Sequence, residues 1–199
     1  MSRSRVIPNY DLYGDSSHDN GSSAFNFEWI PQRSMLYNWL IQPHRHDSFI
    51  QVLYLTQGHV DVQIEQVQQT LHAPCVMLIP AGHVHGFRFS SDTNGPVVTA
   101  RQKALESAAA VMMPTLLDTI RTPRLLSLQS EMRYINQLMP LFLALEQESH
   151  TSAEGQVADL AAPGACSTAT TRCATLAATL DLRGGADAPG LPFPSRAVA

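Results

Sequence analysis

Short apolar runs separated by turn signals fill the segment from residue 29 to residue 102. Within residues 60–65 apolar and polar side chains alternate, so one side of the expected strand is apolar and the other is polar. Many short strands at this spacing predict a mainly β protein built as a sandwich or barrel. The runs of strand type are Met35–Ile41, Phe49–Thr56, Val60–Gln66, Cys75–Ile79, His85–Phe89 and Val97–Ala100.

From residue 103 apolar residues recur every three or four positions, which predicts helices. Lys103–Ile120 is rich in Ala, Leu and Met and predicts a helix up to Pro114. Thr122-Pro123 predicts the start of a second helix, because a capping residue is followed by proline in the first turn. The apolar stripe of this second helix consists of Leu125, Leu128, Met132, Ile135, Met139 and Phe142.

Two interpretations of this stripe are open. It packs against the barrel of its own chain, or it pairs with the same helix of a second subunit and forms a homodimer through residues 123–146. Pro140 interrupts the repeat in either case.

The chain therefore divides into an N-terminal arm (1–28), a barrel (29–102), a helical linker or dimerisation segment (103–149) and a low-complexity tail (150–199). From Pro163 the tail is rich in Ala, Thr, Gly and Pro and has no sustained periodicity. Such a segment buries little apolar area to offset its ordering entropy, so we expect disorder there. One short helix around Ala174–Leu180 is the exception.

Charge and cysteine content limit the function classes. The net charge is −4 and Lys103 is the only lysine, so this chain lacks the basic face of a DNA-binding domain. No stretch has the length of a membrane span, and the N-terminus lacks the apolar run of a signal peptide. The three cysteines, Cys75, Cys166 and Cys173, lack metal-type spacing. We expect a cytoplasmic protein without disulfides that binds neither DNA nor membranes directly.

The candidate chemistry lies in two short segments. His44 and His46 are two residues apart on an extended chain, so both imidazoles point to one side. Gln51 follows on the next strand, and a Pro-x-Gly turn at residues 80–82 leads to His85. Three imidazoles and one amide oxygen suit Fe, Mn, Ni, Zn or Cu ions, so His44, His46, Gln51 and His85 are the candidate metal ligands. The alternative is that these side chains hydrogen-bond to one another or line a pocket without metal.

The same barrel interior is the candidate ligand pocket. We expect Trp39, Leu53 and Phe87 to line it together with the three histidines and Gln51. By strand alternation Arg88 points outward, and neither Arg33 nor Arg45 is better placed. The sequence therefore predicts no interior arginine for an anion and no acid–base pair near the site.

The two segments resemble the two motifs of the cupin superfamily. The first family motif runs H-x-H, three or four residues, Glu, six residues, Gly, and it matches His44, His46, Gln51 and Gly58. The second runs P-x-G, two residues, His, three residues, Asn, and it matches Pro80, Gly82 and His85. Gln51 replaces the glutamate and Phe89 replaces the asparagine, which puts a bound metal in doubt. The resemblance implies a cupin (double-stranded β-helix) barrel.

A longer stretch, residues 5–160, is similar to the sensor halves of AraC-type transcription regulators. The phrases that carry the likeness are IPNYDLYGD, RSMLYNWLIQPHRH, QVLYLTQGHV, APCVMLIPAGHVHGFRF and DTNGPVVTA, and the nearest subgroup responds to p-hydroxybenzoate. The resemblance implies a small effector, here an aromatic carboxylate, and signalling through the helices. Such regulators continue with two helix-turn-helix units, which the last forty residues do not resemble, so we expect a frame shift or truncation near Ala162.

Two functions follow from the sequence. The first is an effector-sensing domain of a transcription regulator. The second is a small metal-dependent cupin enzyme, such as a dioxygenase or an isomerase, because a three-histidine cluster can bind a metal that activates water, O₂ or substrate.

Overall fold

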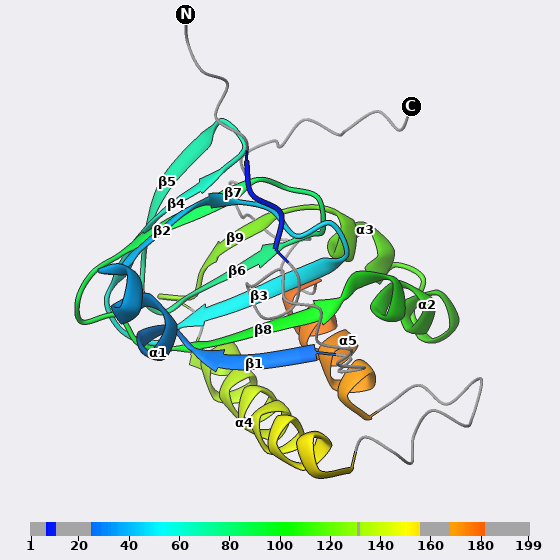
Figure 1. Ribbon diagram of the computed structural model, residues 1–199. Coiled ribbons are helices and arrows are strands. Elements are labelled where there is room, and N and C mark those ends of the chain that lie inside the picture. Colours follow the sequence, from blue (N-terminus) through cyan, green and yellow to red (C-terminus); the bar gives the residue numbers. More distant parts are fainter. Residues whose placement is uncertain (1–6, 11–24, 131, 156–167, 182–199) are drawn as a thin grey trace, which may run out of the picture.

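A computed structural model describes residues 7–10, 25–130, 132–155 and 168–181 (Figure 1). In this part of the chain two antiparallel sheets face each other. The larger sheet has the order β1 (Phe25–Trp29), β8 (Pro96–Arg101), β3 (Phe49–Leu55), β6 (Cys75–Ile79) and β9 (Arg124–Ser127). The smaller sheet has the order β2 (Leu40–His44), β7 (His85–Phe89), β4 (His59–Ile64) and β5 (Val67–His72).

One short helix lies between the first two strands, and the other helices follow β8. A short helix α1 (Ile30–Ser34) runs into a 3-10 turn η1 (Met35–Tyr37) between β1 and β2. After β8 come α2 (Gln102–Met112), α3 (Leu116–Arg121), α4 (Met132–Gly155) and α5 (Thr168–Asp181), which pack on the larger sheet (Figure 1). The predicted mainly β fold with helices after the barrel is confirmed.

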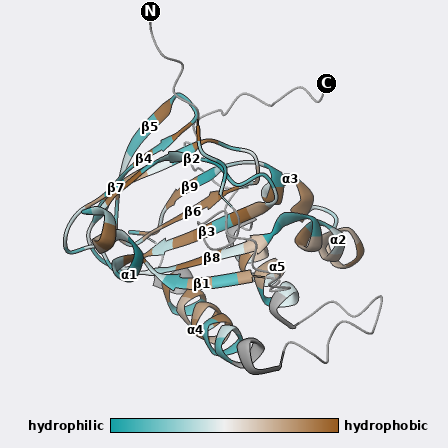
Figure 2. Cartoon of the chain, in the orientation of Figure 1, coloured by the Kyte–Doolittle hydropathy of each residue, from teal (hydrophilic) through white to brown (hydrophobic). Residues whose placement is uncertain are grey.

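Two apolar cores share strand β3. Leu53 and Leu55 point between the sheets and join an interior core with residues of β4, β6 and β7. Ile50, Val52 and Tyr54 point the other way and join a second core with α2, α3, α4 and α5. Because successive strand side chains alternate, a strand buried on both faces must be apolar throughout. Figure 2 shows this hydrophobic character along β3 and β6, whereas the edge strand β5 is largely hydrophilic.

Five of the six expected strands match the structure, and the expected helix before Pro114 corresponds to α2. The strands expected at 49–56, 60–66, 75–79, 85–89 and 97–100 correspond to β3, β4, β6, β7 and β8. Residues 35–41 do not form one strand, because Pro31 starts a helix and the chain turns with positive φ at Asn38 and Trp39 before β2. β5 was not expected, since VQQTLH has too little apolar alternation to signal a strand.

The predicted helix start at Thr122-Pro123 is also wrong. Arg124–Ser127 instead forms β9, which pairs with the edge of β6, and α4 begins at Met132. Leu125 and Leu128 therefore do not belong to a helical stripe. On α4 the side chains of Leu138, Phe142 and Leu145 are fully buried in the second core. This packing agrees with the interpretation in which the helix covers its own barrel.

Helix α5 is longer than expected for the tail. It spans Thr168–Asp181, and Cys173, Ala174, Leu176 and Ala177 are buried against the other helices. Small side chains allow this helix to approach α2 and α4 closely, so this part of the tail does bury apolar surface. The segments 156–167 and 182–199, on which the rest of the prediction for the tail falls, lie outside the described residues.

Across the described ranges, none of the helices combines the length and the hydropathy of a membrane-spanning segment.

Candidate functional site

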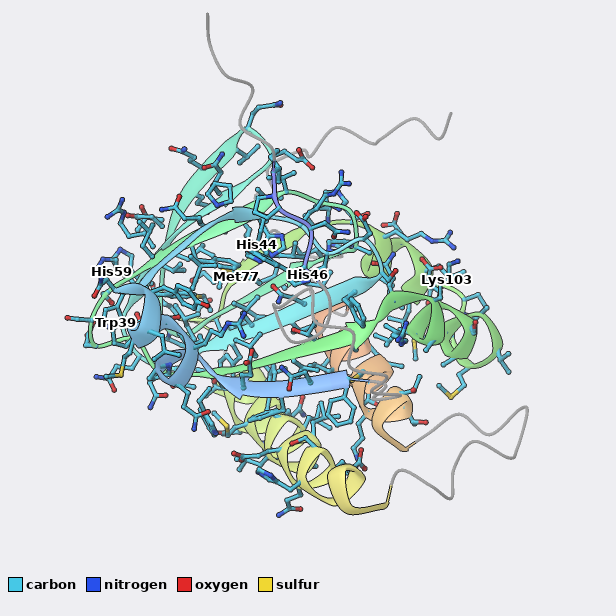
Figure 3. All side chains as sticks on the ribbon, viewed as in Figure 1. Trp39, His44, His46, His59, Met77 and Lys103 are labelled. Atoms are coloured by element: carbon cyan, nitrogen blue, oxygen red, sulfur yellow. The ribbon has the colours of Figure 1, made fainter. Side chains whose placement is uncertain are left out.

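The first histidine pair is formed where β2 ends. His44 is the last residue of β2, and the pairing of β2 with β7 shifts register between Ile41 and His44. His46 follows beyond the strand, where Arg45 forms backbone hydrogen bonds with Pro8 and Tyr10 of the N-terminal arm. His44 and His46 are each 5% exposed, so both rings lie inside the barrel (Figure 3).

His85 completes a cluster of three imidazoles. It lies opposite His44 in the β2–β7 ladder, and the two ring centroids are 4.4 Å apart. The ring centroid of His46 is 5.1 Å from that of His44 and 5.7 Å from that of His85. Three ring nitrogens, one from each histidine, lie within 4.8 Å of one another. The structure thus brings together the three histidines that the sequence selected.

Backbone carbonyls fix the same tautomer on all three rings. The Nδ1 atoms of His44, His46 and His85 lie 2.8, 2.8 and 2.9 Å from the carbonyl oxygens of Gln42, Tyr10 and His83. A carbonyl only accepts, so each Nδ1 carries the proton and each Nε2 keeps its lone pair. Burial lowers the pKa of His44 to about 4 and that of His85 well below its usual value, which keeps these two rings neutral at neutral pH.

The amide of Gln51 cannot donate to both imidazoles that it contacts. Its Nε2 lies 3.3 Å from Nε2 of His46 and 3.2 Å from Oγ1 of Thr99, and its Oε1 lies 3.1 Å from Nε2 of His85. The last contact places an oxygen against a nitrogen lone pair, and rotating the amide by 180° moves this mismatch to His46.

A cation held by the three Nε2 atoms and Oε1 would remove the mismatch. Three imidazoles with protein-fixed tautomers and one oxygen form a donor set that suits Zn, Fe, Mn, Ni or Cu. The residues present therefore fit the transition metal that the sequence predicted, with His44, His46, His85 and Gln51 as its ligands. The identity of the donors does not select one of these metals.

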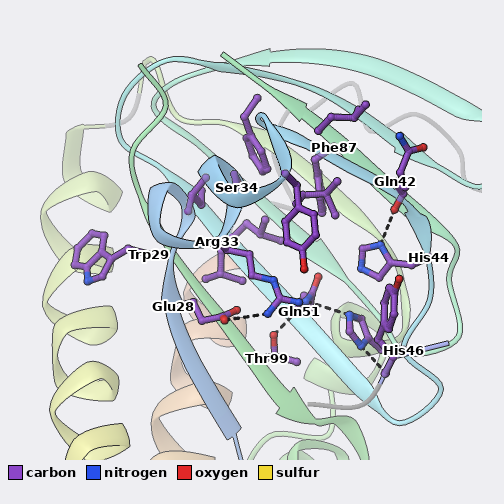
Figure 4. A pocket seen from close by; sticks show the side chains of 18 residues that line it. Glu28, Trp29, Arg33, Ser34, Gln42, His44, His46, Gln51, Phe87 and Thr99 are labelled. Carbon is purple, nitrogen blue, oxygen red and sulfur yellow. Dashed lines mark hydrogen bonds and ion pairs between the residues drawn. The ribbon is translucent and has the colours of Figure 1, made fainter. Parts of the chain in front are cut away.

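A cavity of about 270 Å³ opens beside the cluster (Figure 4). One side is apolar and aromatic, with the stacked rings of Phe87 and Phe89 5.4 Å apart. The other side is polar and includes His44, His46 and Gln51. The complete lining is Tyr10, Glu28, Trp29, Ile30, Arg33, Ser34, Tyr37, Leu40, Ile41, Gln42, His44, His46, Gln51, Leu53, Phe87, Phe89, Val97 and Thr99.

Most of the predicted pocket residues lie at this cavity. His44, His46, Gln51, Leu53 and Phe87 line it, and His85 lies next to it, 1% exposed and in contact with Gln51. Trp39 does not line the cavity. Its backbone has a positive φ of 60°, and its side chain packs on the interior core at a place well separated from His44 and His46 (Figure 3).

The wall of the cavity also has a charged part, which was not predicted from the sequence. Arg33 lines the cavity and its Nη1 donates to Oε1 of Glu28 over 3.3 Å, which corrects the expectation of no interior arginine and of no acidic residue near the site. Arg33 lies on helix α1 (residues 30–34), an element that was not predicted from the sequence. Glu28 was assigned to the arm, although it belongs to the edge strand β1. Proline at 31 was the available signal for the helix.

The comparison with protein families agrees with this geometry. A family model described as AraC-like ligand binding domain matches residues 27–160, which is more than half of the chain. No curated protein matches the chain.

Several solved structures are similar to part of the chain. KdgF from Halomonas sp. is 22% identical over 31% of this chain and 58% of its own, with a TM-score of 0.30. TT1209 from Thermus thermophilus is 30% identical over 31% of this chain and 61% of its own, with a TM-score of 0.28. A cupin-2 domain-containing protein from Shewanella frigidimarina is 17% identical over 39% and 69%, with a TM-score of 0.31. This chain spans little more than half the length of the first two.

Proposed function

Since the chain belongs to the family of AraC-like ligand-binding domains, we propose that it is the effector-sensing part of a transcription regulator and binds a small molecule in the barrel cavity. The observation that carries the proposal is the cavity, which has an aromatic wall on one side and a polar cluster on the other. Its volume of about 270 Å³ lies at the small end of ligand pockets, which span roughly 300–1,000 Å³. A ligand with a single ring suits this size.

An aromatic carboxylate such as p-hydroxybenzoate is the ligand class we propose. Its ring would contact Phe87, Phe89 and Leu53, which are each nearly fully buried. Its carboxylate would face the polar side. A metal on the three histidines and Gln51 would supply a Lewis acid there, and the protein's own contribution is to hold these four donors and to exclude water.

The signal is proposed to reach the helices through β1. Trp29 follows Glu28 in β1, and its indole points away from the cavity toward α4 (Figure 4). Its Nε1 donates to Oε1 of Glu146 on α4 over 2.7 Å. A ligand that moves β1 would therefore also move α4, because this hydrogen bond joins the two elements. Binding in the barrel would in this way change the preferred position of the helix.

Binding of aromatic acids to the purified chain tests the proposal. Thermal shift and isothermal titration with a panel of benzoates, with and without added Zn²⁺ or Mn²⁺, should give saturable stabilisation. Ile41→Trp, which places a large side chain in the cavity, should abolish this stabilisation. Val67→Trp, on the edge strand β5 outside the cavity, should retain it. Equal binding by the Ile41→Trp variant would place the ligand elsewhere, and no binding of any small molecule would refute the sensor function.

A metal-dependent enzyme is the second candidate, favoured by the three ring nitrogens, one from each of His44, His46 and His85, that lie within 4.8 Å of one another. Fe²⁺-loaded protein that consumes O₂ in step with an aromatic substrate, with loss of turnover in His44→Ala, would support a dioxygenase. Stoichiometric ligand binding without conversion would support the sensor.

A further inference from the structure

The wall of the cavity holds one positive and one negative side chain, and they pair with each other. Among its lining residues only Arg33 and Glu28 are formally charged at neutral pH when the histidines are neutral. In the described part of the chain their contact is a single one, from Nη1 of Arg33 to Oε1 of Glu28 over 3.3 Å. The side chains are 36% and 33% exposed, so water reaches both. A partly exposed ion pair with one contact contributes little stability, so a ligand can displace one partner at little cost.

Arg33 points toward the polar cluster of the cavity. Helix α1 projects its side chain toward Gln51 and Thr99 (Figure 4). A ligand whose ring lies on Phe87 and Phe89 would thus meet this guanidinium at the polar side.

A carboxylate is the ligand group that this arrangement fits best. The planar guanidinium offers paired N–H donors that match the two oxygens of a carboxylate. Glu28 accepts from one of these donors with one oxygen, whereas a ligand carboxylate could accept from two. An amide or an alcohol at the same place would leave Arg33 paired with Glu28.

We propose that Arg33 is the residue that selects anionic ligands, and that Glu28 is an internal counter-ion which a ligand carboxylate displaces from Arg33. This inference rests on the proposed effector-binding function and assigns the recognition of the effector's negative charge to the guanidinium of Arg33. Glu28 then sets the affinity threshold, because every carboxylate ligand must compete with it. The two residues have opposite effects: Arg33 favours carboxylates and Glu28 opposes them.

Paired probes test the inference. Isothermal titration of the full chain would use 4-hydroxybenzoate and its neutral analogue 4-hydroxybenzamide. The wild-type protein should prefer the benzoate by roughly tenfold or more. Arg33→Met should lose this preference while it still binds the benzamide, and Arg33→Lys should retain part of it. Glu28→Gln should bind the benzoate several-fold more tightly without a change for the benzamide. Arg88→Met, an exposed arginine on β7 outside the cavity, is the matched control and should resemble wild type.

The outcomes separate this inference from the proposed function. Benzoate binding that is equal in wild type, Arg33→Met and Glu28→Gln overturns the role of Arg33 and leaves the sensor function standing. Tight binding of neutral molecules but of no carboxylate does the same. Absence of any small-molecule binding in the cavity refutes both. Because Glu28→Gln and Arg33→Lys are conservative, they decide the matter even if Arg33→Met does not fold.

Discussion

The turn between β3 and β4 requires a glycine at position 58. Its φ is +81°, and a Cβ there would lie 2.6 Å from Oγ1 of Thr93. Gly58→Ala should therefore destabilise the protein by about 1–3 kcal/mol, from backbone strain and the steric clash together. Urea unfolding measures this loss. Gln57→Ala, at the exposed neighbouring position, should unfold like wild type, and an equally stable Gly58→Ala protein would contradict the argument.

Gln51 offers a test of the metal site. Gln51→Glu adds an anionic oxygen ligand beside the three imidazole nitrogens, so Zn²⁺ should bind about tenfold more tightly or better, a gain of at least ~1.4 kcal/mol. Without metal the carboxylate cannot donate to His46 and Thr99 as the amide of Gln51 does, so the melting temperature should fall. Competition with a fluorescent zinc chelator measures the affinity, with Gln68→Glu on the exposed face of β5 as the control. Unchanged affinity would mean that residue 51 is not a ligand.

Single residues at the site were predictable where one local rule applied. His44 and His46 are two apart and converge, and His85 follows a Pro-x-Gly turn that leads into β7. Arg33 was not predictable in the same way, because its direction depends on whether the backbone of residues 30–34 is helical or extended. Tyr10 contributes through its carbonyl, a group that every residue has, so no sequence pattern marks it.

At the scale of elements, α4 is attached to the larger sheet by a few large side chains. Phe142 is fully buried and stacks on Tyr54 with ring centroids 5.8 Å apart, whereas its neighbour Leu143 is 41% exposed. Phe142→Ala should lower the free energy of unfolding by about 3–5 kcal/mol because it leaves a cavity. Leu143→Ala should change it by less than about 0.5 kcal/mol. Similar losses from the two variants would show that α4 does not pack through this face.

The link between β1 and α4 predicts a measurable effect of the ligand on the helix. At saturating 4-hydroxybenzoate, hydrogen exchange in α4 should slow in wild type and slow less in Trp29→Phe, which lacks the indole donor to Glu146. Glu146→Gln keeps an acceptor oxygen and should behave more like wild type. Ligand protection of α4 that is the same in Trp29→Phe and wild type would exclude this route.

Elements buried on one or both faces were predicted well, and edge elements were not. β3, β6 and β7 have continuous or alternating apolar residues, so their periodicity is visible in the sequence. β9 has four residues and forms because the edge of β6 offers hydrogen-bonding groups, which is a tertiary effect. The same four residues fit a helical spacing when considered alone. Short segments of this kind are decided by their neighbours rather than by their own pattern.

For the whole molecule, the expected homodimer would have to use the outward side of α4. The inner side is occupied by the second core, while Leu143 stays exposed beside Pro140. We predict a concentration-dependent dimer in analytical ultracentrifugation that Leu143→Glu weakens by about tenfold or more, since it places a charge in an apolar contact. Met112→Glu, at an exposed apolar position on α2, should dimerise normally. A monomer at all concentrations would refute the dimer.

Strand β3 belongs to both cores at once, with Gln51 facing the cavity and Ile50 and Val52 facing the helices. We therefore expect ligand selectivity to depend also on the side of β3 that faces the helices: adding or removing a methyl group at Ile50 or Val52 should shift the strand, and Gln51 with it, although neither residue lines the cavity. Laboratory evolution for a new effector should recover substitutions on the concealed side of this strand as readily as on the side that the effector contacts.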